Sequence, residues 1–216
     1  SGFLRYFHSE NNMINAKSEK GTFNQDSVNF SDDSIFDILE KRLRRLKYTD
    51  IICDDLGNER ADYIAFDENR LGFFHAKYKQ VDSDRGKKSA SVLHDVVGQA
   101  LKNLVFLDNI ENIILDRVYQ NKWSNKYPTT QIERIRESAN SSNSIVERIK
   151  ETNRQINVQK YMVLVVNFIS KSEISDYIQN PSTNTNTQIQ QIIWLLSSFI
   201  STCQEMNIIP QIICKP

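Results

Sequence analysis

An acid, an imidazole and a lysine fall within two neighbouring stretches of the chain that have the character of β-strands. Residues 61–66 carry Asp62 among apolar side chains, and residues 71–78 carry His75 and Lys77. Side chains alternate between the faces of a strand, so His75 and Lys77 share one face of the second stretch. A carboxylate and an imidazole can hold a divalent ion, and a lysine can orient water or neutralise a phosphate. The pattern predicts a metal-dependent phosphodiesterase centre.

A short polar turn, residues 67–70, joins the two stretches as in a β-hairpin, which would set Asp62 beside His75 and Lys77. A lone carboxylate in an apolar strand costs several kcal/mol unless it is paired or metal-bound. Simpler interpretations stay open at each position. Asp62 could lie on a half-solvated face, Lys77 could point into solvent together with Lys79, and His75 could be a packed core residue.

The ordered set resembles the PD-(D/E)XK nuclease superfamily, the fold of many restriction enzymes. Its members carry an acid on the second core strand and an acid-x-Lys motif on the third. Asp62 matches the first acid and Lys77 the lysine, whereas His75 stands where the second acid is expected. The resemblance covers residues 31–107. It implies Mg²⁺ or Mn²⁺ as cofactor, held by Asp62 and His75 with help from Glu40 on an upstream helix, and it implies that Lys77 activates water.

The resemblance also assigns a supporting role to Gln99 on a helix predicted for residues 91–107. Members with this glutamine often carry a tyrosine four residues later, where this chain has Asn103. The histidine departs further from the family pattern. Imidazole is a poorer magnesium ligand than carboxylate, so His75 indicates manganese tolerance, a role as general base, or loss of activity.

Other carboxylates lie between the first two predicted strands. Asp54, Asp55 and Glu59 fall in a turn, and we expect them to be solvated there, with Asp54 as the reserve metal ligand.

Basic residues follow directly after the strand that carries Lys77. We predict that they contact DNA phosphates. They are Lys79, Arg85, Lys87 and Lys88. Further along, Tyr119 and Trp123 lie near lysines, an arrangement that could stack on bases or pack in the core.

The elements that must position these residues occur in an α-β-β-β-α order followed by β-α-β. Hairpin strands followed by crossover helices indicate an α/β fold with a central mixed β-sheet flanked by helices, and the resemblance implies a restriction-endonuclease-like core. Residues 110–157 are predicted to form further helices with a polar break at 138–144. The predicted elements are a helix from Ser31, strands at 49–54, 61–66 and 71–78, a helix at 91–107, a strand at 161–168, a helix at 188–205 and a strand at 208–214.

Composition bounds the class of protein. The chain has 216 residues, of which 39% are hydrophobic and 25% charged, as in ordinary globular proteins. We expect an N-terminal segment or linker over residues 1–29 and a nuclease-like domain over residues 30–216. Because 27 basic and 27 acidic residues give a net charge of zero, a stand-alone DNA binder of high affinity is disfavoured. The three cysteines lack CxxC spacing and are expected to be buried free thiols.

The leading hypothesis is a metal-dependent endodeoxyribonuclease domain of a larger bacterial defence or restriction protein, acting on DNA in the cytoplasm. The chain contains no P-loop motif, so the resemblance implies a helicase or ATPase module elsewhere in the polypeptide or complex. No membrane partner is expected, and homo-oligomerisation stays open. Two alternatives remain: a catalytically inactive nuclease-fold module that binds DNA or a partner protein, and an unrelated α/β enzyme such as a phosphatase-like hydrolase.

Overall fold

The computed structural model describes residues 2–57, 59–80, 90–108, 119–124, 129–139, 144–180 and 187–216. Nine strands lie in these ranges: β1 (Phe7–Ser9), β2 (Asp50–Cys53), β3 (Tyr63–Phe66), β4 (Arg70–Lys77), β5 (Lys122–Ser124), β6 (Thr129–Glu133), β7 (Ile135–Glu137), β8 (Gln159–Ser170) and β9 (Ile209–Lys215). The helices are α1 (Ile35–Arg45), α2 (Ala90–Asp108), α3 (Ile145–Arg154), α4 (Lys171–Gln179) and α5 (Thr187–Glu205), with short 3-10 helices η1 (Gly2–Tyr6) and η2 (Asn11–Asn15).

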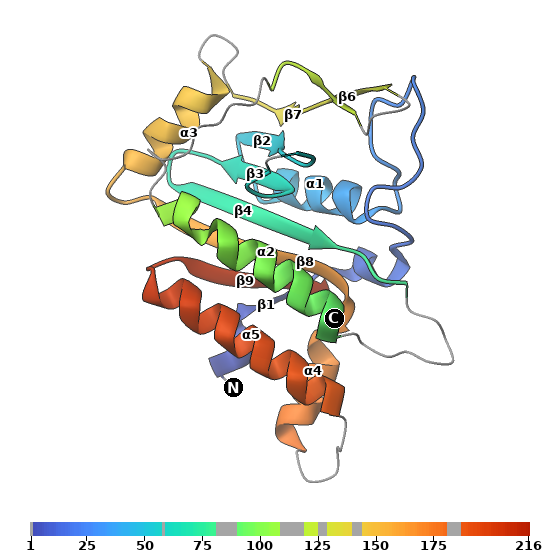
Figure 1. Ribbon diagram of the computed structural model, residues 1–216, viewed down its shortest axis with the longest axis vertical. Coiled ribbons are helices and arrows are strands. Elements are labelled where there is room, and N and C mark those ends of the chain that lie inside the picture. Colours follow the sequence, from blue (N-terminus) through green and yellow to red (C-terminus); the bar gives the residue numbers. More distant parts are fainter. Residues whose placement is uncertain are drawn as a thin grey trace.

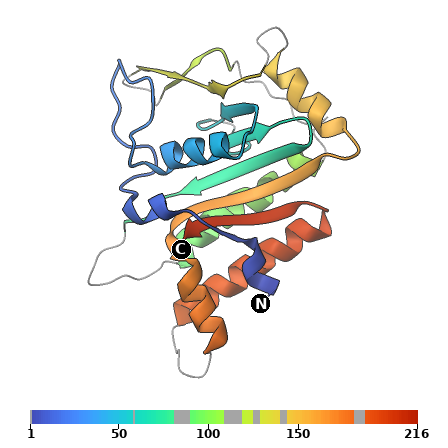
Figure 2. The same ribbon diagram turned by 180° about the vertical axis from the view of Figure 1, so that it is seen from behind.

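Seven of the strands form a mixed sheet in the order β1-β9-β8-β4-β3-β2-β7, while β5 and β6 pair separately. Strands β2, β3 and β4 are antiparallel neighbours, and β4, β8 and β9 run parallel. Helix α1 covers one face of the sheet, and α2 and α5 cover the other (Figures 1 and 2). The predicted mixed sheet flanked by helices is confirmed.

Each face of the sheet has its own apolar core. Phe73 and Leu164 belong to the core beneath α2 and α5, while Phe74 and Val163 belong to the core beneath α1. This division follows from strand alternation, because neighbouring residues of a strand point to opposite faces. Strands buried on both faces lose the polar alternation that marks a half-exposed strand.

Helix α1 begins at Ile35, directly after its N-cap residue Ser34. The Ser34 hydroxyl accepts a hydrogen bond from the backbone N–H of Asp37 at 3.2 Å, which satisfies one of the free donors of the first turn. Apolar side chains of this helix, including Phe36 and Leu39, are buried against the sheet. Basic residues gather in the last turn, where they interact favourably with the helix dipole.

The sequence-based prediction fails between α2 and β8. Residues 110–157 were expected to be helical, but the described part of this stretch contains strands β5, β6 and β7 before α3. The strand β6 alternates exposed and buried residues, a two-residue period that indicates a strand rather than a helix. Helix α4 was not predicted.

The N-terminal segment contributes to the sheet. Strand β1 pairs parallel with β9, and Phe7 is 1% exposed within the core. We expected residues 1–29 to be an N-terminal segment or linker, and within this segment Phe7–Ser9 form the edge strand of the sheet. None of the helices in the described ranges combines the length and apolarity that a membrane crossing requires.

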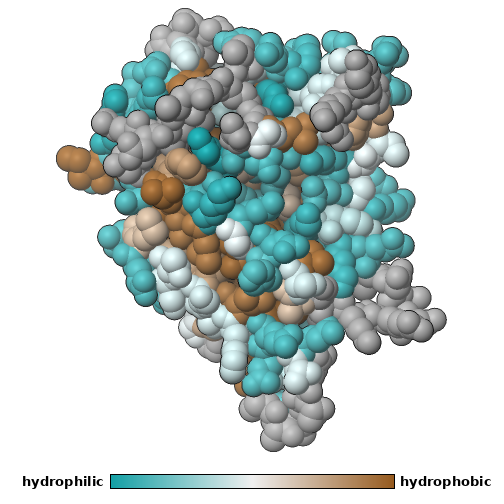
Figure 3. Space-filling view, viewed as in Figure 1, coloured by the Kyte–Doolittle hydropathy of each residue, from teal (hydrophilic) through white to brown (hydrophobic). Residues whose placement is uncertain are grey.

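An apolar stripe is visible on the face of the molecule where α2 and α5 lie (Figure 3). Trp194 of α5 is 70% exposed, and Val105 of α2 is 51% exposed. A shallow hollow of about 440 Å³ is lined by residues of both helices, Trp194 among them.

Candidate functional site

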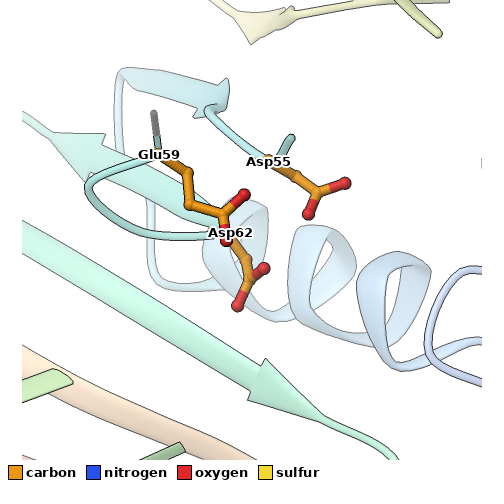
Figure 4. A group of neighbouring side chains, drawn as sticks. All are labelled: Asp55, Glu59 and Asp62. Atoms are coloured by element: carbon orange, nitrogen blue, oxygen red, sulfur yellow. The ribbon is translucent and has the colours of Figure 1, made fainter. Parts of the chain in front are cut away.

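Three carboxylates converge in the loop that joins β2 to β3. Asp55, Glu59 and Asp62 each offer an oxygen atom, and these atoms all lie within 4.8 Å of one another. Figure 4 shows the three side chains pointing toward one another beside β4. Asp55 is 3% exposed and Asp62 is 9% exposed, so this acidic cluster is largely withdrawn from water.

Asp62 is tied to β4 by its backbone and by its side chain. Its N–H donates to the carbonyl of Phe74 at 3.0 Å, which extends the β3–β4 ladder by one residue. Its carboxylate accepts a hydrogen bond from the N–H of Ala76 at 2.6 Å. Burial raises the pKa of Asp62 well above its ordinary value, and the negative charge of Asp55 raises it further.

The regular alternation of β3 ends at Asp62. Residues two apart on a strand share a face, yet Ala61 packs in the core beneath α2 and Tyr63 in the core beneath α1. The strand accordingly begins at Tyr63. This irregularity lets the Asp62 carboxylate reach the Ala76 N–H instead of standing upright on one face.

Asp54 and Asp55 are held by residues far away in the sequence. Asp54 accepts hydrogen bonds from the hydroxyl of Tyr119 at 2.8 Å and from the N–H of Arg60 at 2.8 Å. Asp55 accepts one from the indole N–H of Trp123 at 2.9 Å. The expectation that these carboxylates are solvated is wrong, because both are almost fully buried.

Tyr119 and Trp123 thereby acquire a role that the sequence did not reveal. They are 2% and 0% exposed, so in this structure they pack in the core and do not offer surfaces for base stacking. Their O–H and N–H groups donate hydrogen bonds to the acidic loop, since a buried tyrosine or tryptophan usually finds a partner for its polar atom.

Glu59 is fixed by the turn in which it lies. Its carboxylate accepts a hydrogen bond from the N–H of Leu56 at 2.7 Å. Leu56 and Gly57 have φ values of 75° and 84°, and this left-handed turn is easier for glycine than for leucine. Burial raises the pKa of Glu59, and Asp55 adds to the increase. The cluster thus contains two carboxylates that hold protons more tightly than usual.

Lys77 lies at the end of β4, on the strand next to Asp62. Its Nζ is 3.9 Å from a carboxylate oxygen of Glu19, and its side chain is 37% exposed. Glu19 also accepts a hydrogen bond from the N–H of Tyr78 at 3.4 Å. Beyond it, the side chain of Asn167 binds both the N–H and the carbonyl of Lys79 at 2.8 Å each, which fixes the path of the chain after Lys77.

His75 is 2% exposed and lies on β4 opposite Leu164 of β8. Among the described residues its Nε2 atom has no hydrogen-bond partner. Burial lowers the pKa of His75 to about 4, so the imidazole is neutral near pH 7. His75 was expected to act as a ligand or base, but it is not a member of the acidic cluster.

Glu40, the other residue expected to reach the metal, makes a buried ion pair elsewhere. Its carboxylate accepts hydrogen bonds from the hydroxyl of Tyr63 at 2.7 Å and from Nε of Arg136 at 2.7 Å. Arg44, one helical turn later, also contacts it at 3.3 Å. Glu40 links α1 to β7 and is not part of the acidic cluster.

Of the remaining predicted site residues, the structure describes two, Gln99 and Lys79. Gln99 is exposed on α2, and Lys79 is half-buried just after β4. Arg85, Lys87 and Lys88 lie outside the described residues.

The acidic cluster fits a divalent cation. Carboxylate oxygens are the ligands that Mg²⁺ and Mn²⁺ prefer, and a cation bound between neighbouring carboxylates would offset their mutual repulsion. One positive charge is already there. The Lys20 ammonium lies 2.9 Å and 3.0 Å from the two oxygens of Asp55, as a cation supplied by the chain itself. The candidate ligands are Asp55, Glu59 and Asp62.

Comparison with known proteins finds no matching family model, no matching curated protein and no matching solved structure. The site must therefore be judged on its own residues and geometry.

Proposed function

We propose that this chain is a divalent-metal-dependent deoxyribonuclease domain that hydrolyses phosphodiester bonds of DNA. The observation that carries the proposal is the position of Asp62. It is a buried carboxylate immediately before β3, hydrogen-bonded to the N–H of Ala76 in β4, and one of its oxygens lies within 4.8 Å of oxygens of two further carboxylates. Lys77 follows one residue after the Ala76 contact. The element order α1-β2-β3-β4-α2 supports the resemblance to restriction-endonuclease-like nucleases.

In this proposal Asp55, Glu59 and Asp62 hold one Mg²⁺ or Mn²⁺ ion. A metal ion bound there would polarise the phosphate and make water a better nucleophile. Lys77 contributes an ammonium that orients the attacking water or neutralises charge on the phosphate. Its partial exposure of 37% leaves it within reach of a substrate. Asn167 fixes the backbone beyond Lys77 and so limits where that ammonium can go.

The proposed ligand set differs from the one that the family pattern implies. His75 and Glu40 are left out because neither belongs to the acidic cluster. Asp55 and Glu59 take the place of the missing second acid. Gln99 is exposed on α2 and is not assigned a catalytic role here.

Substrate and partners follow from the resemblance. We propose double- or single-stranded DNA as substrate, contacted by Lys79 and by the basic residues Arg85, Lys87 and Lys88. A helicase or ATPase module of a bacterial defence system would bring DNA to the site in the cytoplasm. Because the chain has a net charge of zero, it lacks the excess positive charge that attracts DNA phosphates, and delivery by a partner module would compensate for this.

A second candidate is a catalytically inactive module of the same fold that binds DNA or a partner protein. Two observations favour it. Lys20 already provides a positive charge to Asp55, and the position of the second acid is occupied by the neutral, buried His75.

Manganese-soaked crystals distinguish the two candidates. Anomalous scattering at the manganese edge should reveal an ion within ligand distance of Asp62, and the Asp62→Asn variant should lose that peak. Purified wild-type protein should also cleave plasmid or single-stranded DNA in Mn²⁺ and not in EDTA. Ion binding without cleavage of either substrate would favour the inactive module. The absence of an ion at Asp62 would reject the proposed metal site.

A further inference from the structure

The segment before α1 brings two charged residues, Glu19 and Lys20, to the acidic cluster. The carbonyl of Ser18 accepts a hydrogen bond from the N–H of Ile35 at 3.0 Å, and the carbonyl of Glu19 accepts one from Phe36 at 3.0 Å. These bonds fasten residues 17–20 to the first turn of α1. We call residues 17–20 the N-terminal strap. Because the strap is anchored to α1, its backbone holds Lys20 next to Asp55.

Lys20 reaches both oxygens of Asp55. Its Nζ lies at 3.0 Å and 2.9 Å from them, and its side chain is 21% exposed. Its Nζ is also 3.6 Å from Glu19 and 5.2 Å from the ring centre of Phe36. Burial by itself lowers the pKa of Lys20, but the charge and hydrogen bond of Asp55 together with the charges of Glu19 and Asp62 raise it above its ordinary value. Lys20 is therefore positively charged over the whole physiological pH range.

A single ammonium does not neutralise this cluster. Asp55, Glu59 and Asp62 together carry up to three negative charges, against the single positive charge of Lys20. A divalent ion would bring twice the charge of a lysine, and it would need Asp55 oxygens that Lys20 and Trp123 now engage. The lysine and a metal ion therefore compete for the same carboxylate.

We propose that Lys20 is a built-in cation that opposes metal binding at the acidic cluster, so that the N-terminal strap sets the metal concentration at which the site is occupied. This inference rests on the proposed metal site. In the metal-free protein Lys20 stabilises the buried Asp55 carboxylate. When a divalent ion binds, Lys20 leaves Asp55. A ligand that draws the strap away from the cluster would raise the affinity for metal, which makes the strap a point of regulation.

The test compares Lys20→Met with wild type by calorimetric titration of Mn²⁺ and by melting of the metal-free protein. Methionine keeps the length and the apolar stem of the side chain but removes the charge. Lys20→Met should melt at a lower temperature without metal, because Asp55 loses its ion pair with Lys20, and should bind Mn²⁺ on the order of tenfold more tightly. Lys20→Gln, which keeps a hydrogen-bond donor, provides the same test if the methionine variant does not fold.

Two controls separate the inference from the proposed function. Lys17→Met removes a lysine of the same strap whose side chain is 78% exposed and paired with Asp33, and it should change neither quantity. Asp62→Asn should abolish Mn²⁺ binding in every background. If wild type and Lys20→Met bind Mn²⁺ equally and through Asp62, the inference is overturned while the metal site stands. If neither binds Mn²⁺ in a way that depends on Asp62, the metal site fails and the inference fails with it.

Discussion

The carboxylate of Asp62 accepts a hydrogen bond of 2.6 Å from the backbone N–H of Ala76, the residue between His75 and Lys77. This bond fixes the first acid of the motif against the strand that carries the lysine. The sequence pattern implied that Asp62 would lie beside His75. In the structure the Asp62 carboxylate instead lies with those of Asp55 and Glu59, while His75 stays in the core.

Asp62 should make the metal-free protein less stable at neutral pH. Its folded pKa is raised above 3.8, so the folded state binds the proton more tightly, and stability falls as the pH rises through the raised pKa. Asp62→Asn keeps an acceptor for Ala76 and removes the charge. We therefore expect Asp62→Asn to have a larger free energy of unfolding than wild type at pH 7.5. The gain should disappear below pH 3.8.

Denaturant unfolding in EDTA at pH 7.5 and at pH 3.5 measures this difference. Asp26→Asn, at an exposed position, controls for the removal of a carboxylate. A destabilised Asp62→Asn protein at pH 7.5 would mean that the carboxylate is compensated within the metal-free structure.

His75 should limit stability in acid. An imidazole with a pKa of about 4 in the folded state and 6.5 in the unfolded state opposes folding once the unfolded chain can take up the proton. The stability that this group permits at pH 7 is lost as the pH falls from 6.5 to about 4, and the total loss is about 3 kcal/mol. The free energy of unfolding of His75→Leu should therefore rise relative to that of wild type as the pH falls through that interval. Its metal-dependent cleavage should persist.

Unfolding curves of wild type and His75→Leu at pH 7.5, 5.5 and 4 measure the gap between their free energies of unfolding. His94→Leu, on the exposed side of α2, is the control for removing an imidazole. A gap that stays constant with pH would contradict the burial of a neutral His75. Loss of cleavage in His75→Leu would return His75 to the site.

Lys77 should matter for catalysis and little for stability. Its ion pair with Glu19 is 3.9 Å long and partly exposed, and such pairs contribute about 1 kcal/mol or less. Lys77→Met should therefore melt within a few degrees of wild type and cleave DNA at least tenfold more slowly. Lys102→Met, on the exposed side of α2, is the matched control. Unaltered cleavage by Lys77→Met would remove this lysine from the mechanism.

Asn167 should act on both properties. It is 4% exposed and binds both backbone polar groups of Lys79 at 2.8 Å. Asn167→Ala leaves these groups without their partner, at a cost of about 1–3 kcal/mol, and frees the chain that positions Lys77. Melting temperature and cleavage rate should both fall, whereas the exposed Asn15→Ala should change neither. A stable, fully active Asn167→Ala protein would show that the clamp is dispensable.

The main elements of the fold could be predicted because their signals are local. The apolar stripe of α1, the hairpin turn after β3 and the continuous apolar run of β8 each fix an element without knowledge of the rest. The strands β5, β6 and β7 span only three to five residues, so propensity within them carries little information. Helix α4 is short as well, and it was missed for the same reason.

The composition of the site could be predicted only in part. Asp62 and Lys77 stood out because a charge within an apolar strand is unusual. Asp55 and Glu59 resembled ordinary turn residues, since what buries them comes from elsewhere in the chain. Trp123 lies 68 positions from Asp55, and Lys20 lies 35 positions from it. Such long-range partners leave no periodic signal in the sequence. Glu40 matched a family pattern and His75 occupied the position of its second acid, but a buried ion pair with Arg136 accounts for Glu40 and core packing accounts for His75.

The rate of DNA cleavage by wild type and by Asp62→Asn, measured side by side in Mn²⁺, tests the central claim most directly. Wild type should cleave DNA in Mn²⁺ or Mg²⁺ and be inactive in EDTA. Asp62→Asn, folded and at least as stable, should be slower by about 100-fold or more, because it lacks the carboxylate charge that holds the ion. Cleavage by Asp62→Asn at the wild-type rate would contradict the assignment of this acidic cluster as a nuclease centre.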